Sequence, residues 1–230
     1  MKFGVIQFPG SNCDHDCFYS SSVNTGAESV YMWHKDTELP SDIDCVIVPG
    51  GFSYGDYLRC GAVARFAPIM NAVSDFAKKG GYVIGICNGF QILTEAGLLP
   101  GALLQNESQS FICKDTYLKV AGESPFTKNL NQGDILKIPI AHGEGNYYAD
   151  DDTIKMLQDT DSIAFYYSDI NGLVDKSTNP NGSLLNIAGI TNKSKNVLGM
   201  MPHPDRSSDE LLGYGDGVKI YKSLMTYLSK

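Results

Sequence analysis

The chain has 230 residues, of which 26 are acidic and 18 basic, giving a formal net charge of −8. A chain of this length can bury a large core without cross-links, and α/β chains of this size often form one unit, so we expect a single domain over residues 1–230. The acidic balance and the lack of a basic run argue against general binding to nucleic acid or to an anionic membrane, since both need clustered Lys and Arg.

The cysteine content and the length of the apolar runs indicate the cellular compartment of the protein. Six cysteines in a chain of this length are too few for a disulfide-stabilised scaffold. The apolar runs, such as residues 82–87, are far shorter than a membrane span requires. Residues 1–8 are apolar but lack the organisation of a signal peptide and end at Pro9. The sequence therefore predicts a cytoplasmic protein with reduced thiols.

The first half of the chain alternates strand and helix patterns. In chain order we expect a strand at 2–8, a turn at 9–12, a helical stretch to about Gly26, strands at 29–34 and 45–48, a helix over 63–77, a strand at 82–86 and a helix from Asn88. Pro68 predicts a kink or a late start in the helix over 63–77. Continuous apolar strands separated by helices are typical of a parallel sheet covered on both faces.

The second half shows shorter strands with polar alternation. We expect them at 111–120, 135–140, 163–167, 184–191 and 197–201. This pattern predicts antiparallel additions to the same sheet or a small side layer. The acidic run 150–152 and the polar stretch 175–183 are interpreted as surface loops, and residues 218–228 as a closing helix.

The sharpest local motif is Gly85-Ile86-Cys87-Asn88-Gly89, which fits a nucleophile elbow with Cys as the nucleophile. Small residues on both sides allow a tight strand-to-helix turn, and the following helix presents its positive end to the sulfur, which favours the thiolate. The backbone N–H of Asn88 would then face a developing oxyanion. The alternative is a buried structural Cys at a strand-to-helix turn.

Two further segments are candidates for the same site. Asp205 lies two residues after His203 in a Pro-rich segment. If this segment is extended, both side chains point to the same side, and the carboxylate can orient the imidazole as the acid of a catalytic triad does. Gly50 and Gly51 follow the predicted strand 45–48, where open α/β sheets bind ligands and where paired glycines allow close backbone approach. The alternatives are a surface His and a plain glycine turn.

Five segments together resemble the class I glutamine amidotransferases: 9–14, 50–56, 85–91, 141–145 and 201–206. The match covers the chain to about Arg206. The strings Gly-Gly-Phe-Ser-Tyr-Gly-Asp and Ala-His-Gly-Glu-Gly are similar, more narrowly, to the glutaminase subunits of phosphoribosylformylglycinamidine synthases. The resemblance implies a flavodoxin-like α/β fold with a mostly parallel central sheet, helices on both faces and antiparallel additions in the second half.

The resemblance also implies roles for individual residues. Cys87 matches the nucleophile, His203 the base and Asp205 the acid, although the family usually has Glu at that last position. Gly51 and Asn88 match the backbone donors of the oxyanion hole. The positions matching substrate contacts are Gln91, His142 and Gly143.

The implied reaction is hydrolysis of L-glutamine to glutamate and ammonia through a Cys87 thioester. No P-loop or other nucleotide motif occurs in the sequence, so no cofactor is expected on this chain. From the family, ATP and Mg would act on a large synthetase partner that makes formylglycinamidine ribonucleotide in purine biosynthesis. A small third subunit is possible in this family.

Two other interpretations stay open. One is a non-catalytic regulatory module on the same scaffold, and the other is a hydrolase of the Cys-elbow superfamily with different substrates. We expect no metal site, because the stretch Cys13-Asp14-His15-Asp16-Cys17 matches no zinc spacing and has no second ligand pair after it.

Overall fold

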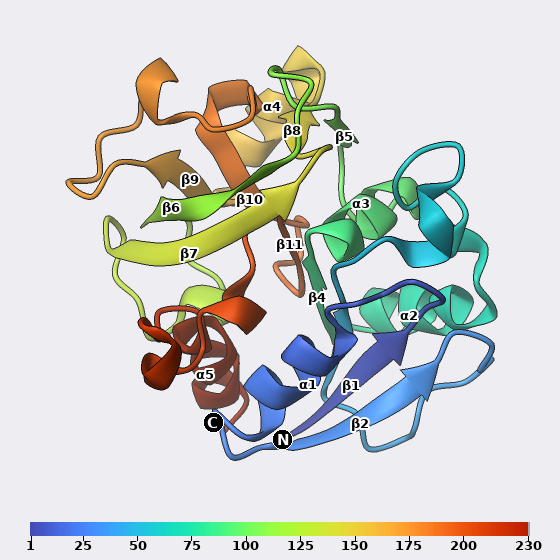
Figure 1. The fold of residues 1–230 in the computed structure, drawn as a ribbon. Coiled ribbons are helices and arrows are strands. Elements are labelled where there is room, and N and C mark those ends of the chain that lie inside the picture. The colour runs from blue at the N-terminus through green and yellow to red at the C-terminus, as the bar shows by residue number, and fades with distance from the viewer. Residues whose placement is uncertain (230) are drawn as a thin grey trace.

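A computed structural model describes residues 1–229. Within that range, strands from both halves of the chain form one nine-stranded sheet in the order β2-β1-β3-β4-β11-β10-β9-β6-β7 (Figure 1). The strands in this order are β2 (Glu28–Trp33), β1 (Lys2–Gln7), β3 (Cys45–Val48), β4 (Tyr82–Ile86), β11 (Val197–Met200), β10 (Ile187–Thr191), β9 (Ile163–Ser168), β6 (Ile112–Val120) and β7 (Ile135–His142). A separate two-stranded sheet pairs β5 (Ala102–Leu104) with β8 (Asn146–Tyr148).

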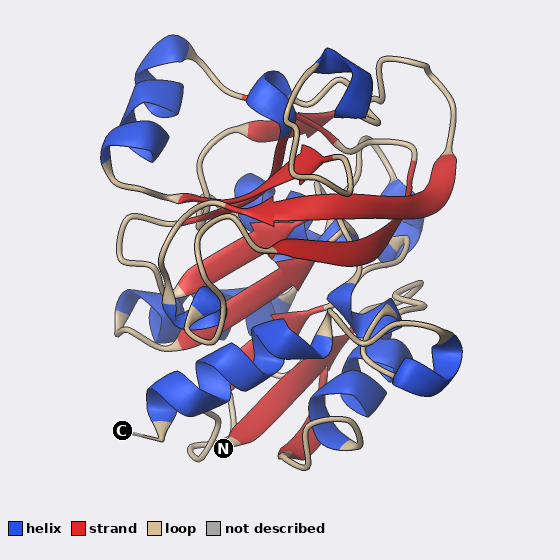
Figure 2. Ribbon diagram, turned by 90° about the vertical axis from the view of Figure 1, so that its left-hand side faces the viewer, coloured by secondary structure: helices blue, strands red, loops and turns tan. Residues whose placement is uncertain are grey.

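Helices cover the parallel part of the large sheet on both faces (Figures 1 and 2). Helices α1 (Asp14–Ser22) and α5 (Val218–Leu228) contact each other on one face, while α2 (Pro68–Lys78) and α3 (Asn88–Glu95) lie on the other. A fifth helix, α4 (Asp151–Asp159), lies beyond the antiparallel strands. Strands β1, β3 and β4 are buried on both sides, which explains their continuous apolar sequences.

The predicted fold class is confirmed, with differences at several elements. Strand β11 was expected among the antiparallel additions, but it pairs in parallel with β4 and so joins the two halves of the sheet. Its four residues are all buried, and burial on both faces suits a strand between two neighbours. The additions β10, β9, β6 and β7 are antiparallel, as expected.

Local boundaries also differ from the sequence expectation. Residues 150–152 are not a loop, because the Asp150 side chain accepts a hydrogen bond from Thr153 N at 2.8 Å and caps α4. Carboxylates favour helix N-termini, so the acidic run starts a helix. Leu184–Asn186 form a 3-10 turn ahead of β10, and α1 ends at Ser22 rather than near Gly26. Pro68 begins α2 at its first turn, which confirms the late start.

Within residues 1–229, every helix is too short or too polar to cross a membrane.

The first testable prediction concerns the strand that joins the two halves of the sheet. Leu198 in β11 is fully buried, so Leu198→Ala should lower the free energy of unfolding by about 2–5 kcal/mol through lost burial and a residual cavity. Urea denaturation followed by circular dichroism measures this change. The matched control is Leu211→Ala, because Leu211 is 93% exposed and should change stability by no more than about 0.5 kcal/mol. Equal effects in the two variants would contradict the position of β11 in the core.

Candidate active site

The candidate site is a cavity of about 440 Å³ at the carboxyl ends of the parallel strands. The segments that follow β1, β3 and β4 meet there. The strand order reverses at β1, because β2 lies on one side of it and β3 on the other. Open α/β sheets bind ligands at such a switch point. The predicted site residues that line it are Gly51, Cys87, Gln91, His142, Gly143 and His203. Asn88 and Asp205, the other two, are buried directly beside Cys87 and His203.

Cys87 sits in a strained turn between β4 and α3. Its φ of 50° and ψ of −106° are strained for any residue other than glycine. Cys87 is also the N-cap residue of α3. A Cβ on Gly85 would approach Gly89 O to 2.7 Å, and a Cβ on Gly89 would overlap Val48 O. Glycine is therefore required on both sides of the turn. The Cys87 thiol contacts Ala141 O at 3.7 Å, and the residue lines the cavity at the N-terminal end of α3.

His203 and Asp205 form a buried pair. His203 Nδ1 lies 3.3 Å from Asp205 Oδ1 and 3.5 Å from Oδ2, and both side chains are almost fully enclosed. The contact was predicted, but its stated reason was wrong, because Pro204–Arg206 form a 3-10 turn rather than an extended chain. Burial lowers the pKa of His203, yet the Asp205 carboxylate and the Cys87 thiolate outweigh this and hold that pKa well above its usual value. The pair is thus suited to an imidazolium beside a thiolate.

Asn88 links the glycine loop, residues 50–56 after β3, to helix α3, which begins at the elbow. Its side-chain oxygen accepts from Ser53 N at 3.0 Å, and its amide donates to Asp56 Oδ1 at 3.0 Å and to Gln91 Oε1 at 2.9 Å. Gly51, in the same loop, has a φ of 131°, and a Cβ there would lie 2.6 Å from Asn12 N. These contacts fix the loop close to the Cys87 elbow.

Two asparagines hold the segment opposite the elbow. Asn106 accepts from Gly145 N at 3.0 Å and donates to His142 O at 2.9 Å, while Asn181 donates to Gly145 O at 2.8 Å. Gln91 Nε2 reaches the same segment from α3 and donates to Glu144 O at 2.5 Å. Neither asparagine was predicted from the sequence, because their partners lie 36 to 39 residues away along the chain. No local pattern could have identified them.

His142 is placed to shape this segment. Its ring is buried against Gly145, where a Cβ would overlap it, and Nε2 lies 3.3 Å from Asn181 Nδ2. Burial, with a smaller contribution from the charge on His203, lowers the pKa of His142 to about 3. The ring is therefore neutral at ordinary pH.

Cys13 and Arg206 are in contact beside the His203–Asp205 pair, and the sequence predicted no role for either residue in the site. Arg206 Nη2 lies 3.0 Å from the Cys13 sulfur, and Cys13 Sγ, a ring nitrogen of His203 and a carboxylate oxygen of Asp205 all lie within 4.8 Å of one another. Burial raises the pKa of the Cys13 thiol, and contact with His203 opposes that rise. The buried pair thus has two thiols in its cavity, Cys87 and Cys13.

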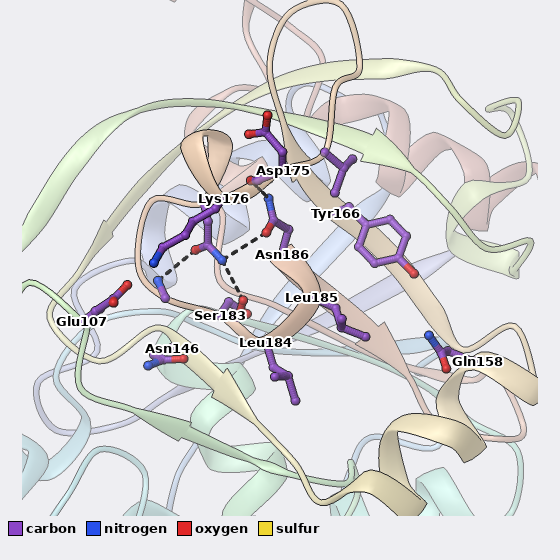
Figure 3. Close-up of a pocket in the computed structure, with 13 residues that line it drawn as sticks. Glu107, Asn146, Gln158, Tyr166, Asp175, Lys176, Ser183, Leu184, Leu185 and Asn186 are labelled. Atoms are coloured by element: carbon purple, nitrogen blue, oxygen red, sulfur yellow. Dashed lines mark hydrogen bonds between the residues drawn. The ribbon is translucent and has the colours of Figure 1, made fainter.

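A second, larger cavity of about 790 Å³ lies beside the loop before β10 (Figure 3). Asn179 organises that loop, accepting from Gly182 N at 2.8 Å and donating to Ser183 O at 2.7 Å and Asn186 Oδ1 at 3.2 Å. Among the described residues, its lining contains neither cysteine nor histidine. It therefore has no pairing of a cysteine nucleophile with a histidine base, which the smaller cavity does have, so the smaller cavity is the candidate active site.

The second testable prediction follows from the buried imidazole of His142. Its ring signals in NMR spectra, assigned by their loss in His142→Gln, should stay at neutral-form positions from about pH 7.5 to about pH 5, because its pKa is about 3. Free histidine in the same buffers is the control and titrates near pH 6.5. The folded state binds fewer protons here than the unfolded chain, so this group removes stability as the pH falls below about 6.5. A midpoint for His142 between about pH 6 and 7 would contradict the assigned burial.

Comparison with known proteins agrees with this geometry. The family described as "CobB/CobQ-like glutamine amidotransferase domain" matches residues 1–213. A relative from Moorella thermoacetica, named "Phosphoribosylformylglycinamidine synthase subunit PurQ", is 56% identical over 99% of this chain and 96% of its own. A relative of the same name from Koribacter versatilis is 52% identical over the full length of both chains. A solved structure described as "Structure of PurLQS from Thermotoga maritima" matches with a TM-score of 0.87 and 44% identity, over 99% of this chain and 98% of that one. The chain belongs to the glutamine amidotransferase family and, within it, to the PurQ subunits of phosphoribosylformylglycinamidine synthase.

Proposed function

We propose that this chain hydrolyses L-glutamine to glutamate and ammonia as the glutaminase subunit of a phosphoribosylformylglycinamidine synthase. The observation that carries the proposal is a cysteine in a strained elbow that shares one small cavity with a buried His–Asp pair. A nucleophile, a base and an orienting acid are the groups that acyl transfer through a thioester requires. The full-length likeness to PurQ subunits supports the choice of glutamine as the substrate.

In the proposed first step, the Cys87 thiolate attacks the side-chain carbonyl carbon of glutamine. The backbone N–H groups of Gly51 and Asn88 receive the oxyanion, and the imidazolium of His203 gives its proton to the departing ammonia. Asp205 orients the ring and stabilises its charge without exchanging the proton itself.

In the proposed second step, neutral His203 takes a proton from water, and the resulting hydroxide attacks the thioester carbon. The C–S bond breaks, glutamate leaves, and the Cys87 thiolate and His203 imidazolium are restored. Gln91 and Gly143 line the cavity. The Gln91 side chain would contact the glutamine, and the backbone around Gly143 would hold its amino-acid end. His142 would support them by holding the segment in place.

We further propose that the chain acts as one cytoplasmic domain and passes ammonia to a large synthetase subunit, with a small third subunit in the complex. The likeness to a structure described as PurLQS supports these partners. ATP and Mg would bind the synthetase, because this sequence carries no nucleotide motif. Ammonia released into water would be protonated and lost as a nucleophile, so transfer to a docked partner suits the chemistry.

The third testable prediction assigns the nucleophile. Cys87→Ala should abolish release of glutamate from glutamine, a loss of at least about 1,000-fold, because no other group forms the thioester. Cys113→Ala is the matched control, since Cys113 lines the same cavity but lies on β6 and is exposed, and it should keep the parent rate. A glutamine-like electrophile should label Cys87 in peptide mapping. If no variant or parent chain releases glutamate even with its partners, a regulatory module would be the better description.

The fourth testable prediction concerns activation by the synthetase. In the glycine loop and just after it, Tyr54, Gly55, Asp56 and Leu58 all have positive φ, and the Leu58 side chain is 94% exposed. Residues other than glycine are strained in this conformation, and a docked partner can select another backbone state of the segment, the one that aims Gly51 N–H at the oxyanion. Losing one oxyanion donor costs about 100- to 1,000-fold in rate, so the lone chain should be slower than the complex by up to this factor.

The measurement is glutamate release by the chain alone and with its synthetase, small subunit, ATP and formylglycinamide ribonucleotide. Leu58→Asp should reduce the activation while leaving the rate of the lone chain near that of the parent. The control is Val23→Asp, which is 63% exposed just after α1, away from the glycine loop, and should activate normally. A lone chain as fast as the complex would instead indicate a free-standing glutaminase.

A further inference from the structure

Cys13 lies in a cluster with His203 and Asp205, and it is the member of this cluster that the reaction described above does not use. One ligand atom from each lies within 4.8 Å of the other two, and all three residues are buried. They come together because α1, whose N-cap is Cys13, packs against the 3-10 turn Pro204–Arg206. The cluster therefore depends on tertiary packing between the two ends of the chain.

Two atoms of this cluster lack the partners that buried polar atoms normally have. Within residues 1–229, neither His203 Nε2 nor Asp205 Oδ1 has a hydrogen-bond partner, although Oδ1 lies 3.3 Å from His203 Nδ1. An unpaired polar atom in the interior is costly, and a bound ion would satisfy it. The Cys13 sulfur adds a third donor, held by Arg206 Nη2 at 3.0 Å and by Asn12 Oδ1 at 3.4 Å.

We propose that Cys13, His203 and Asp205 bind a divalent cation of the Zn²⁺ type, which inhibits the enzyme by occupying its base. One thiolate, one imidazole and one carboxylate are the ligand types that zinc prefers. Ligands of a tetrahedral zinc ion with bonds of about 2.0–2.3 Å lie about 3.5 Å apart, so side-chain shifts of about 1 Å would complete the geometry. Water would take the fourth position.

Binding has a defined proton balance. The Cys13 thiol and the His203 imidazolium each lose a proton to solvent, and the metal takes the lone pairs that this leaves. With the metal on one ring nitrogen, His203 can no longer form the imidazolium that gives its proton to the leaving ammonia, so an occupied site is inactive. The Arg206 guanidinium stabilises the Cys13 thiolate but repels a cation, which makes the ion a reversible inhibitor rather than a resident cofactor.

This site differs from the metal pattern that the sequence suggested and that we discounted. In the run from Cys13 to Cys17 the possible ligands are neighbours in the sequence, and Cys17 cannot join them because it is buried in the apolar core. The ligands that meet Cys13 come instead from residues 190 or more positions further along the chain.

The fifth testable prediction is that zinc inhibition depends on Cys13. The rate of glutamate release is measured against buffered free Zn²⁺, with each protein compared with its own metal-free rate. Cys13→Ala should raise the inhibitory concentration by about 10- to 100-fold or more, as loss of a metal-site group does. Cys113→Ala, the control, should be inhibited like the parent chain. No inhibition of the parent, or equal inhibition of Cys13→Ala, would overturn the proposal, the latter result placing the metal on Cys87 and His203.

A second measurement removes any dependence on the proposed glutaminase activity. Co²⁺ is added to the inactive Cys87→Ala chain, and thiolate-to-cobalt charge-transfer absorption is recorded. The band should persist in Cys87→Ala and disappear in the double variant with Cys13→Ser, a nearly isosteric change that keeps the packing, as circular dichroism will verify. Absence of the band from Cys87→Ala would exclude Cys13 as a ligand, whatever the glutaminase assay shows.

Discussion

At the carboxyl end of β4 the backbone of Gly89 packs directly against the Val48 carbonyl at the end of β3, with no room for a side chain between them. This contact forces the turn at Cys87 into its strained conformation and brings the glycine loop after β3 next to the first turn of α3. Because the sheet is parallel here, the reactive ends of both strands face the same edge. The positions of the nucleophile and of its proposed oxyanion donors follow from that one backbone approach.

The electrostatics of the site depend on burial of a compact set of charges. His203 is enclosed between a carboxylate and a thiolate, so the penalty for burying its charge is outweighed and its pKa rises. His142, in the same cavity, faces no such partner, and burial lowers its pKa to about 3. Two imidazoles in one cavity thus differ in charge because of what lies beside each ring, which separates the proposed acid–base residue from a structural one.

The wall opposite the elbow is built by amides rather than by charges. Asn106 and Asn181 bond the backbone on both sides of Gly143, and Gln91 reaches the same segment from α3. Amide side chains both donate and accept, so they can hold a bent backbone segment without adding charge near the thiolate. Asn181 comes from the loop beside the larger cavity, so that loop and the active-site wall are mechanically connected.

The sequence by itself determined the elements whose signals are local. Turn chemistry identified the Gly85–Gly89 elbow, apolar runs identified the buried strands, and motif spacing identified the family. Tertiary structure alone decided that β11 is parallel to β4, that Asn106 and Asn181 hold residues 142–145, and that Cys13 lies beside His203. Periodicity and turn residues report the conformation of a few neighbouring residues. Contacts across 36 to 190 positions depend on how whole elements pack, which no short pattern in the chain encodes.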